Sequence, residues 1–166
     1  MKFKVMNESK TGTYIFRGVG DNVGSSEHKY GGEFFADNPT DAGNYGDIID
    51  VFTLNNANLY SGESSIEYCK AEQLMFDPHP YISKMSGGRY DILDDVCEDL
   101  IFNGEDPNLG LAIFQAVAKS SLEKKGYQGA DWSYEDDLIW HQYQIWDTSC
   151  LKHIETLSCY DAEKKY

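Results

Sequence analysis

The sequence has little of what a nucleic-acid-binding or membrane protein needs. Only two of its 14 basic residues are arginines, Arg17 and Arg89, and 28 acidic residues bring the net charge to −14. Proteins bind nucleic acid by neutralising its phosphates with lysine and arginine, so we expect no direct binding to nucleic acid. No stretch approaches the roughly 18 apolar residues of a membrane span, and the amino-terminal residues lack the apolar core of a secretion signal. These absences predict a cytoplasmic protein.

Cysteine pairs with metal-binding spacing are also missing. The four cysteines, at positions 69, 97, 150 and 159, form no CxxC motif. Cys150 and His153 make a CxxH pair, but no second pair completes a zinc site. We therefore expect reduced thiols and no bound metal.

What is present indicates one folded domain of 166 residues. Apolar periodicity predicts strands over 13–18, 33–36, 47–54, 138–146 and 151–158, and helices from 39 to about 45 and over 107–125. Asn38 followed by Pro39 is typical of a helix start. Residues 160–166 are expected to be a tail. Strands at both ends with helices between them predict an α+β fold.

Three segments stand out by their order and spacing. The first is an aromatic strand that ends in Arg-Gly, YIFRG, at 14–18. The second is GGEFFADNPTDAGNYG at 31–46, with a strand directly after it. The third runs from GYQGADWS at 126–133 to HQYQIWDTSCLKHI at 141–154. The order and spacing of the three segments together carry the signal.

With these segments the chain resembles the ADP-ribosyltransferase-like fold, and in particular the small phage and toxin members. Anti-CRISPR ADP-ribosyltransferases encoded by phages have a similar layout in a small acidic chain. The resemblance covers residues 13–60 and 107–154. It implies a single domain over 1–166 with a split β-sheet, helices packed on the sheet, and a family-specific helical insertion at 61–106. It also implies NAD as the substrate.

The resemblance carries candidate cofactor-binding residues with it. Arg17, followed by Gly18, would orient NAD, because a guanidinium suits contact with phosphate. Phe35 and Tyr45, with Tyr30 as a further candidate, match positions where the family stacks nicotinamide. The alternatives are an ordinary surface ion pair for Arg17 and core packing for the aromatic residues. Phe34 and Phe35 face opposite sides of a strand, and we expect Phe35 to face the cleft.

Gln142 stands where the resemblance leads one to expect a catalytic glutamate. An amide can hydrogen-bond a ribose hydroxyl, but it offers no negative charge to an oxocarbenium-like state. A neighbouring acid could replace the glutamate, with Asp137 and Glu135 the first candidates and Asp131 behind them. Alternatively, the chain binds NAD or a partner without chemistry, or the glutamine is an introduced substitution that traps the cofactor.

Two functions from different classes follow. The first is a mono-ADP-ribosyltransferase that transfers ADP-ribose from NAD to a macromolecule, such as a host protein, as a phage counter-defence or toxin-type effector. The second is an acidic, non-catalytic protein that inhibits a nucleic-acid-binding machine by occupying its basic surface.

Overall fold

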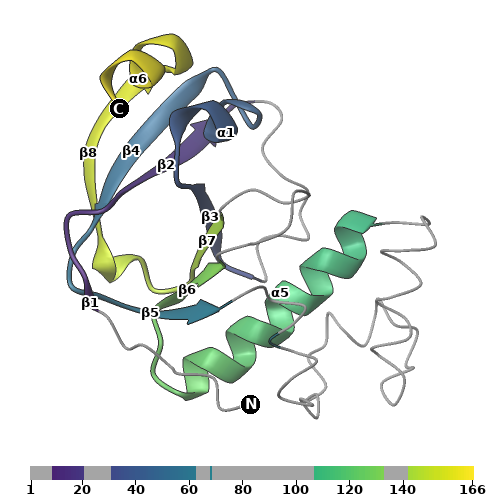
Figure 1. The fold of residues 1–166 in the computed structure, drawn as a ribbon. Helices are drawn as coiled ribbons and strands as arrows, with labels where there is room; N and C mark the ends of the chain where they lie inside the picture. Colours follow the sequence, from purple (N-terminus) through teal and green to yellow (C-terminus); the bar gives the residue numbers. More distant parts are fainter. Residues whose placement is uncertain (1–8, 21–30, 63–67, 69–106, 133–141) are drawn as a thin grey trace.

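The computed structural model describes residues 9–20, 31–62, 68, 107–132 and 142–166. Within these residues one sheet carries eight strands in the order β1-β5-β6-β7-β3-β2-β4-β8 (Figure 1). The strands are β1 (Ser9–Lys10), β2 (Tyr14–Val19), β3 (Glu33–Ala36), β4 (Ile48–Leu54), β5 (Ala57–Gly62), β6 (Gly129–Trp132), β7 (Gln142–Ile145) and β8 (Leu151–Ser158). The helices are α1 (Pro39–Gly43), α5 (Pro107–Lys124) and α6 (Cys159–Lys165), and a 3-10 turn spans Thr148–Cys150. The fold is α+β, as the sequence predicted, although the chain ends in helix α6 rather than in a strand.

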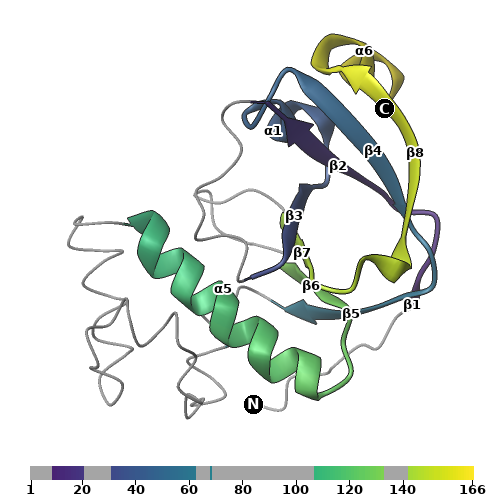
Figure 2. The ribbon, with the colours of Figure 1, turned by 180° about the vertical axis from the view of Figure 1, so that it is seen from behind.

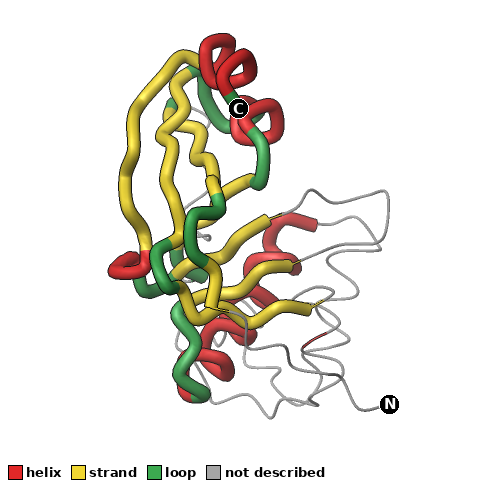
Figure 3. Tube along the Cα trace, turned by 60° about the vertical axis from the view of Figure 1, so that its left-hand side comes forward, coloured by secondary structure: helices red, strands yellow, loops and turns green. Residues whose placement is uncertain are grey.

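The sheet divides between β2 and β3. These strands pair only at Phe16 and Ala36, whereas β2 and β4 pair along their whole length from Tyr14–Thr53 to Val19–Ile48. We call β1-β5-β6-β7-β3 the five-strand half and β2-β4-β8 the three-strand half. Figure 3 shows the strands of the two halves running in clearly different directions. The single pairing makes the β2–β3 boundary the point where the sheet bends.

Each face of the sheet has its own apolar core, because alternate residues of a strand point to opposite faces. The inner face carries a cluster of Ile15, Phe35, Leu54, Ala57, Leu59, Tyr143, Ile145 and Cys150. The outer face carries a cluster of Phe16, Ala36, Ala42, Ile49, Val51 and Ala162. Helices α1 and α6 cover the outer face of the three-strand half, and α5 lies along the five-strand half (Figures 1 and 2).

Local sequence signals predicted most of these elements. The Asn38 side chain accepts a hydrogen bond from the Asp41 backbone nitrogen, and Pro39 begins α1. Helix α5 begins at Pro107 and ends at Lys124, close to the predicted bounds. The predicted strand over 138–146 is present from Gln142, and its first four residues lie outside the described part. The proposed insertion at 61–106 also lies outside it, apart from Ser61 and Gly62, which end β5, and Tyr68.

The prediction of a tail at 160–166 is wrong. Residues Cys159–Lys165 form α6, which Ser158 caps by accepting a hydrogen bond from the Asp161 backbone nitrogen. Ala162 is buried in the outer-face core. This helix needs a tertiary surface to cover, because seven residues are too few for a stable isolated helix. In the described part of the chain, no helix is long and apolar enough to cross a membrane.

Candidate functional site

Arg17 joins the two halves of the sheet where their backbone pairing stops. Because Phe16 packs in the outer-face core, the next residue of β2, Arg17, lies on the inner face. Its Nη1 lies 2.7 Å from Oε2 of Glu33, the first residue of β3. The two side chains are 37% and 42% exposed, respectively. The contact is therefore an accessible ion pair across the β2–β3 boundary.

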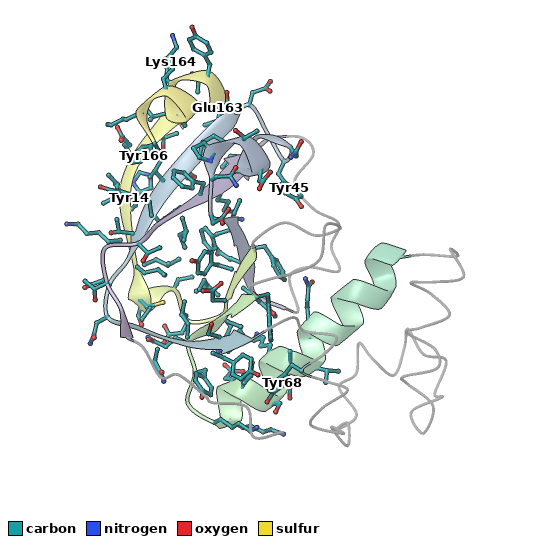
Figure 4. The ribbon with its side chains drawn as sticks, in the orientation of Figure 1. Tyr14, Tyr45, Tyr68, Glu163, Lys164 and Tyr166 are labelled. Atoms are coloured by element: carbon teal, nitrogen blue, oxygen red, sulfur yellow. The ribbon has the colours of Figure 1, made fainter. Side chains whose placement is uncertain are left out.

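Gly18 allows α1 to pack directly on β2. A Cβ atom at this position would lie 2.1 Å from the Ala42 carbonyl oxygen and 3.0 Å from the Tyr45 Cβ. Only glycine fits so close a backbone approach. Tyr45 follows α1 and is 41% exposed. Figure 4 labels it beside this helix. Burial, and then the charge of Asp41, raise the pKa of the Tyr45 hydroxyl. Gly18 and Tyr45 thus belong to one packed unit on the outer face, opposite the face of Arg17.

Phe35 does not face an open cleft as the sequence suggested. It is 2% exposed, and its ring packs edge-to-face on Phe52 with centroids 5.4 Å apart. The reason is the register, which pairs Phe35 with Tyr143 on the inner face, where both join the apolar core. Its neighbour Phe34 lies on the opposite face, where a Cβ at Gly31 would stand 3.1 Å from its ring.

Position 142 and Arg17 lie on opposite faces of the sheet. Gln142 pairs with Ala36 of β3 and with Trp132 of β6, and Ala36 pairs with Phe16 of β2. This cross-strand row belongs to the outer face, because its member on β2 is Phe16, and the next residue, Arg17, points to the inner face. The candidate residues Glu135, Asp137 and Tyr30 lie outside the described part of the chain. Asp131, the reserve candidate, is 6% exposed and pairs with Tyr143.

Gln144 is fully buried and makes three hydrogen bonds. Its Oε1 accepts a hydrogen bond from Trp132 Nε1 at 2.9 Å. Its Nε2 donates to the carbonyl oxygens of Gly31 at 2.8 Å and Gln115 at 2.9 Å. The amide thus connects β7 with β6, with α5 and with the residues before β3. One of the two amides of this strand is therefore explained by packing.

Sequence reasoning missed a set of polar side chains around Arg17. Asp50 of β4 pairs with Arg17 on one side and with Thr156 of β8 on the other. Thr156 Oγ1 donates to Asp50 Oδ1 at 2.5 Å. His153 Nε2 lies 3.1 Å from Thr156 Oγ1 and 3.6 Å from Asp50 Oδ1. A signal existed in the sequence: Asp50 interrupts an otherwise apolar strand, DIIDVF.

The described thiols and acids do not assemble a metal centre. No group of three or more histidine, cysteine, aspartate or glutamate side chains comes together among the described residues. Cys150 and Cys159 are free thiols. Burial, followed by the charge of Asp147, raises the pKa of Cys150, and burial, followed by the charge of Glu163, raises that of Cys159. Neither shift favours the reactive thiolate.

Comparison with known proteins gives one distant likeness. No family model and no curated protein matches the chain. Among solved structures, the chain is similar to one described as "Crystal structure of an anti-CRISPR protein". The two share 15% identity and a TM-score of 0.42 over 87% of this chain and 94% of the other. Similarity at this level transfers neither a fold family nor a function.

Proposed function

We propose that the chain is a mono-ADP-ribosyltransferase that transfers ADP-ribose from NAD to a protein. The observation that carries the proposal is Arg17 at the boundary where β2 and β3 stop pairing. A guanidinium at such a boundary is accessible to a diphosphate, and two of its N–H groups can donate hydrogen bonds to the phosphate oxygens together. Glu33 occupies the guanidinium when no ligand is bound, so the diphosphate displaces it.

The rest of NAD extends from Arg17 in two directions. The exposed Tyr45, held near Gly18, supplies a ring on which nicotinamide stacks. Phe35 has no part in this contact, because it belongs to the core. Gln142 hydrogen-bonds the reactive ribose from the outer face. Because Gln142 shares the row in which Ala36 still pairs with Phe16, a ligand bound on Arg17 has to pass around this row to reach position 142.

The reaction also needs a negative charge beside the developing oxocarbenium ion, and Gln142 has none. Glu135 and Asp137 precede the strand that carries Gln142 and are proposed to supply this charge. If neither does, the same fold binds NAD without cleaving it.

Incubation with NAD labelled on its adenylate moiety tests the proposal. We expect label to appear on a protein of a cell lysate, and unlabelled NAD to suppress it. Calorimetry with purified protein measures NAD binding separately. Binding of NAD without label transfer would show that the chain binds NAD without cleaving it. Absence of both binding and label transfer would contradict the proposal.

A second candidate function rests on the acidic surface around α1 and α6. Asp41, Asp47, Asp161 and Glu163 outnumber the two lysines of α6, Lys164 and Lys165, at this end of the three-strand half, and Tyr160 is 64% exposed. Such a surface suits an inhibitor that occupies the basic groove of a nucleic-acid-binding protein. In that case binding to the basic partner should weaken strongly with added salt and compete with nucleic acid. It should be unaffected by NAD and by Arg17→Ala; sensitivity to either would favour the transferase.

A further inference from the structure

A row of polar side chains begins at Glu33 on β3 and extends through Arg17 across the inner face of the three-strand half. We call Glu33, Arg17, Asp50, Thr156 and His153 the polar strip. Register places Arg17, Asp50 and Thr156 directly beside one another on β2, β4 and β8. Neighbouring strands are about 4.8 Å apart, so the strip spans about 10 Å from β2 to β8.

The strip is accessible and chemically asymmetric. Thr156 and His153 are exposed, and the Asp50 side chain is 29% exposed. One end presents the donors of Arg17, and the other presents a carboxylate and a hydroxyl that already bond to each other. Toward β5, the same face becomes apolar at Phe52 and Leu54. The polar row is open to solvent where the rest of the same face is a buried core, so a ligand can reach these side chains.

We propose that the polar strip binds the ribose and diphosphate of a nucleotide. Arg17 contacts the diphosphate, in place of Glu33, as planar guanidinium donors match phosphate oxygens. Asp50 accepts hydrogen bonds from the two ribose hydroxyls, and Thr156 holds the carboxylate in position. The inference deepens the proposed function and rests on it: the strip takes the adenosine ribose of NAD, while the reactive ribose lies on the β3 side of Arg17.

The two carboxylates beside Arg17 have opposite roles in this proposal, which makes it testable. General electrostatics predicts that removing either negative charge strengthens binding of an anionic nucleotide. Here only the removal of Glu33 does so, because Glu33 competes with the phosphates. Removal of Asp50 weakens binding, because its carboxylate contacts the sugar.

The experiment measures binding of ADP and of 2′,3′-dideoxyadenosine diphosphate to the full chain by calorimetry. For Asp50→Asn we expect ADP affinity to fall about tenfold, the usual scale for a hydrogen bond to a charged group, with the dideoxy compound unaffected. Glu33→Gln should bind both compounds several-fold more tightly. Thr156→Val should also lower the affinity for ADP but not for the dideoxy compound, by a smaller factor than Asp50→Asn. It replaces Asp50→Asn in the experiment if that variant fails to fold. Glu123→Gln, exposed on α5, is the charge-matched control.

Three results would overturn the inference: no binding of ADP, tighter ADP binding by Asp50→Asn, or equal weakening for ADP and the dideoxy compound. The outcomes also separate the two proposals. If the chain transfers label from NAD but Asp50→Asn changes the affinities for ADP and for the dideoxy compound equally, only the proposal for the polar strip is overturned. If Asp50→Asn weakens binding of ADP but not of the dideoxy compound, and no label is transferred from NAD, only the proposed transferase activity is overturned.

Discussion

Replacing Gln144 with leucine is expected to destabilise the fold by about 2–4 kcal/mol. The substitution leaves two buried groups without this partner, the Trp132 indole N–H and the Gly31 carbonyl oxygen. The Gln115 carbonyl oxygen loses one bond but remains within helix α5. Each orphaned buried group costs about 1–3 kcal/mol, partly offset by the greater burial of an apolar side chain. Gln144→Glu should be no milder, because its carboxylate would face two carbonyl oxygens. Urea denaturation measures the change in unfolding free energy.

Gln128 provides the matched control for this prediction. Its side chain also makes several hydrogen bonds, to the Asn58 backbone nitrogen, to Asp147 and to Ser149. These partners are exposed, so water replaces the amide when it is removed. We expect Gln128→Leu to cost at most about 1 kcal/mol. Equal unfolding free energies for Gln144→Leu and the unmodified chain would show that the buried network contributes nothing.

Replacing Arg17 with alanine is expected to lower label transfer from NAD by roughly a hundredfold or more. The guanidinium is the only positive group that the proposal sets against the diphosphate, and lost electrostatic contacts of this kind commonly cost about 10²–10³ in rate. Arg17→Lys should keep part of the activity, because an ammonium retains the charge but not the paired N–H donors. The measurement is the initial rate of labelling at fixed NAD.

Stability should respond quite differently to the same change. The Arg17–Glu33 ion pair is accessible to water, and exposed pairs contribute at most about 1 kcal/mol. Arg17→Ala should therefore unfold at nearly the same urea concentration as the unmodified chain. Lys152→Ala removes an exposed positive charge from β8 and should leave labelling unchanged. If Arg17→Ala labels as fast as Lys152→Ala, Arg17 has no part in NAD use.

The secondary structure of the motif segment at 31–46 was predicted well because its signals are local. Asn38 and Pro39 mark the helix start by capping and by a fixed backbone angle. Gly18 permits the close approach of α1 to β2, a contact that was not predicted from the sequence. The helix Cys159–Lys165 was missed for the opposite reason: its stability comes from the surface it covers.

The candidate site was predicted less completely, because strand alternation alone does not say which face of the sheet is open. Phe35 was expected at a ligand, yet register pairs it with Tyr143 inside the core. Asp50 was not singled out, yet register places it beside Arg17. Pairing partners are set by residues far away in the chain, so no local pattern could have identified these neighbours.

The sequence by itself determined the α+β class, the start of α1, and the two amides of β7 with their even spacing. Those properties depend on side-chain type and period within one segment. Tertiary structure decided what the amides face. Pairing between β3, β6 and β7, together with the position of α5, buries Gln144 among three hydrogen-bond partners. The same pairing separates position 142 from Arg17 by one residue of register, since a one-residue offset in a pleated strand moves a side chain to the opposite face.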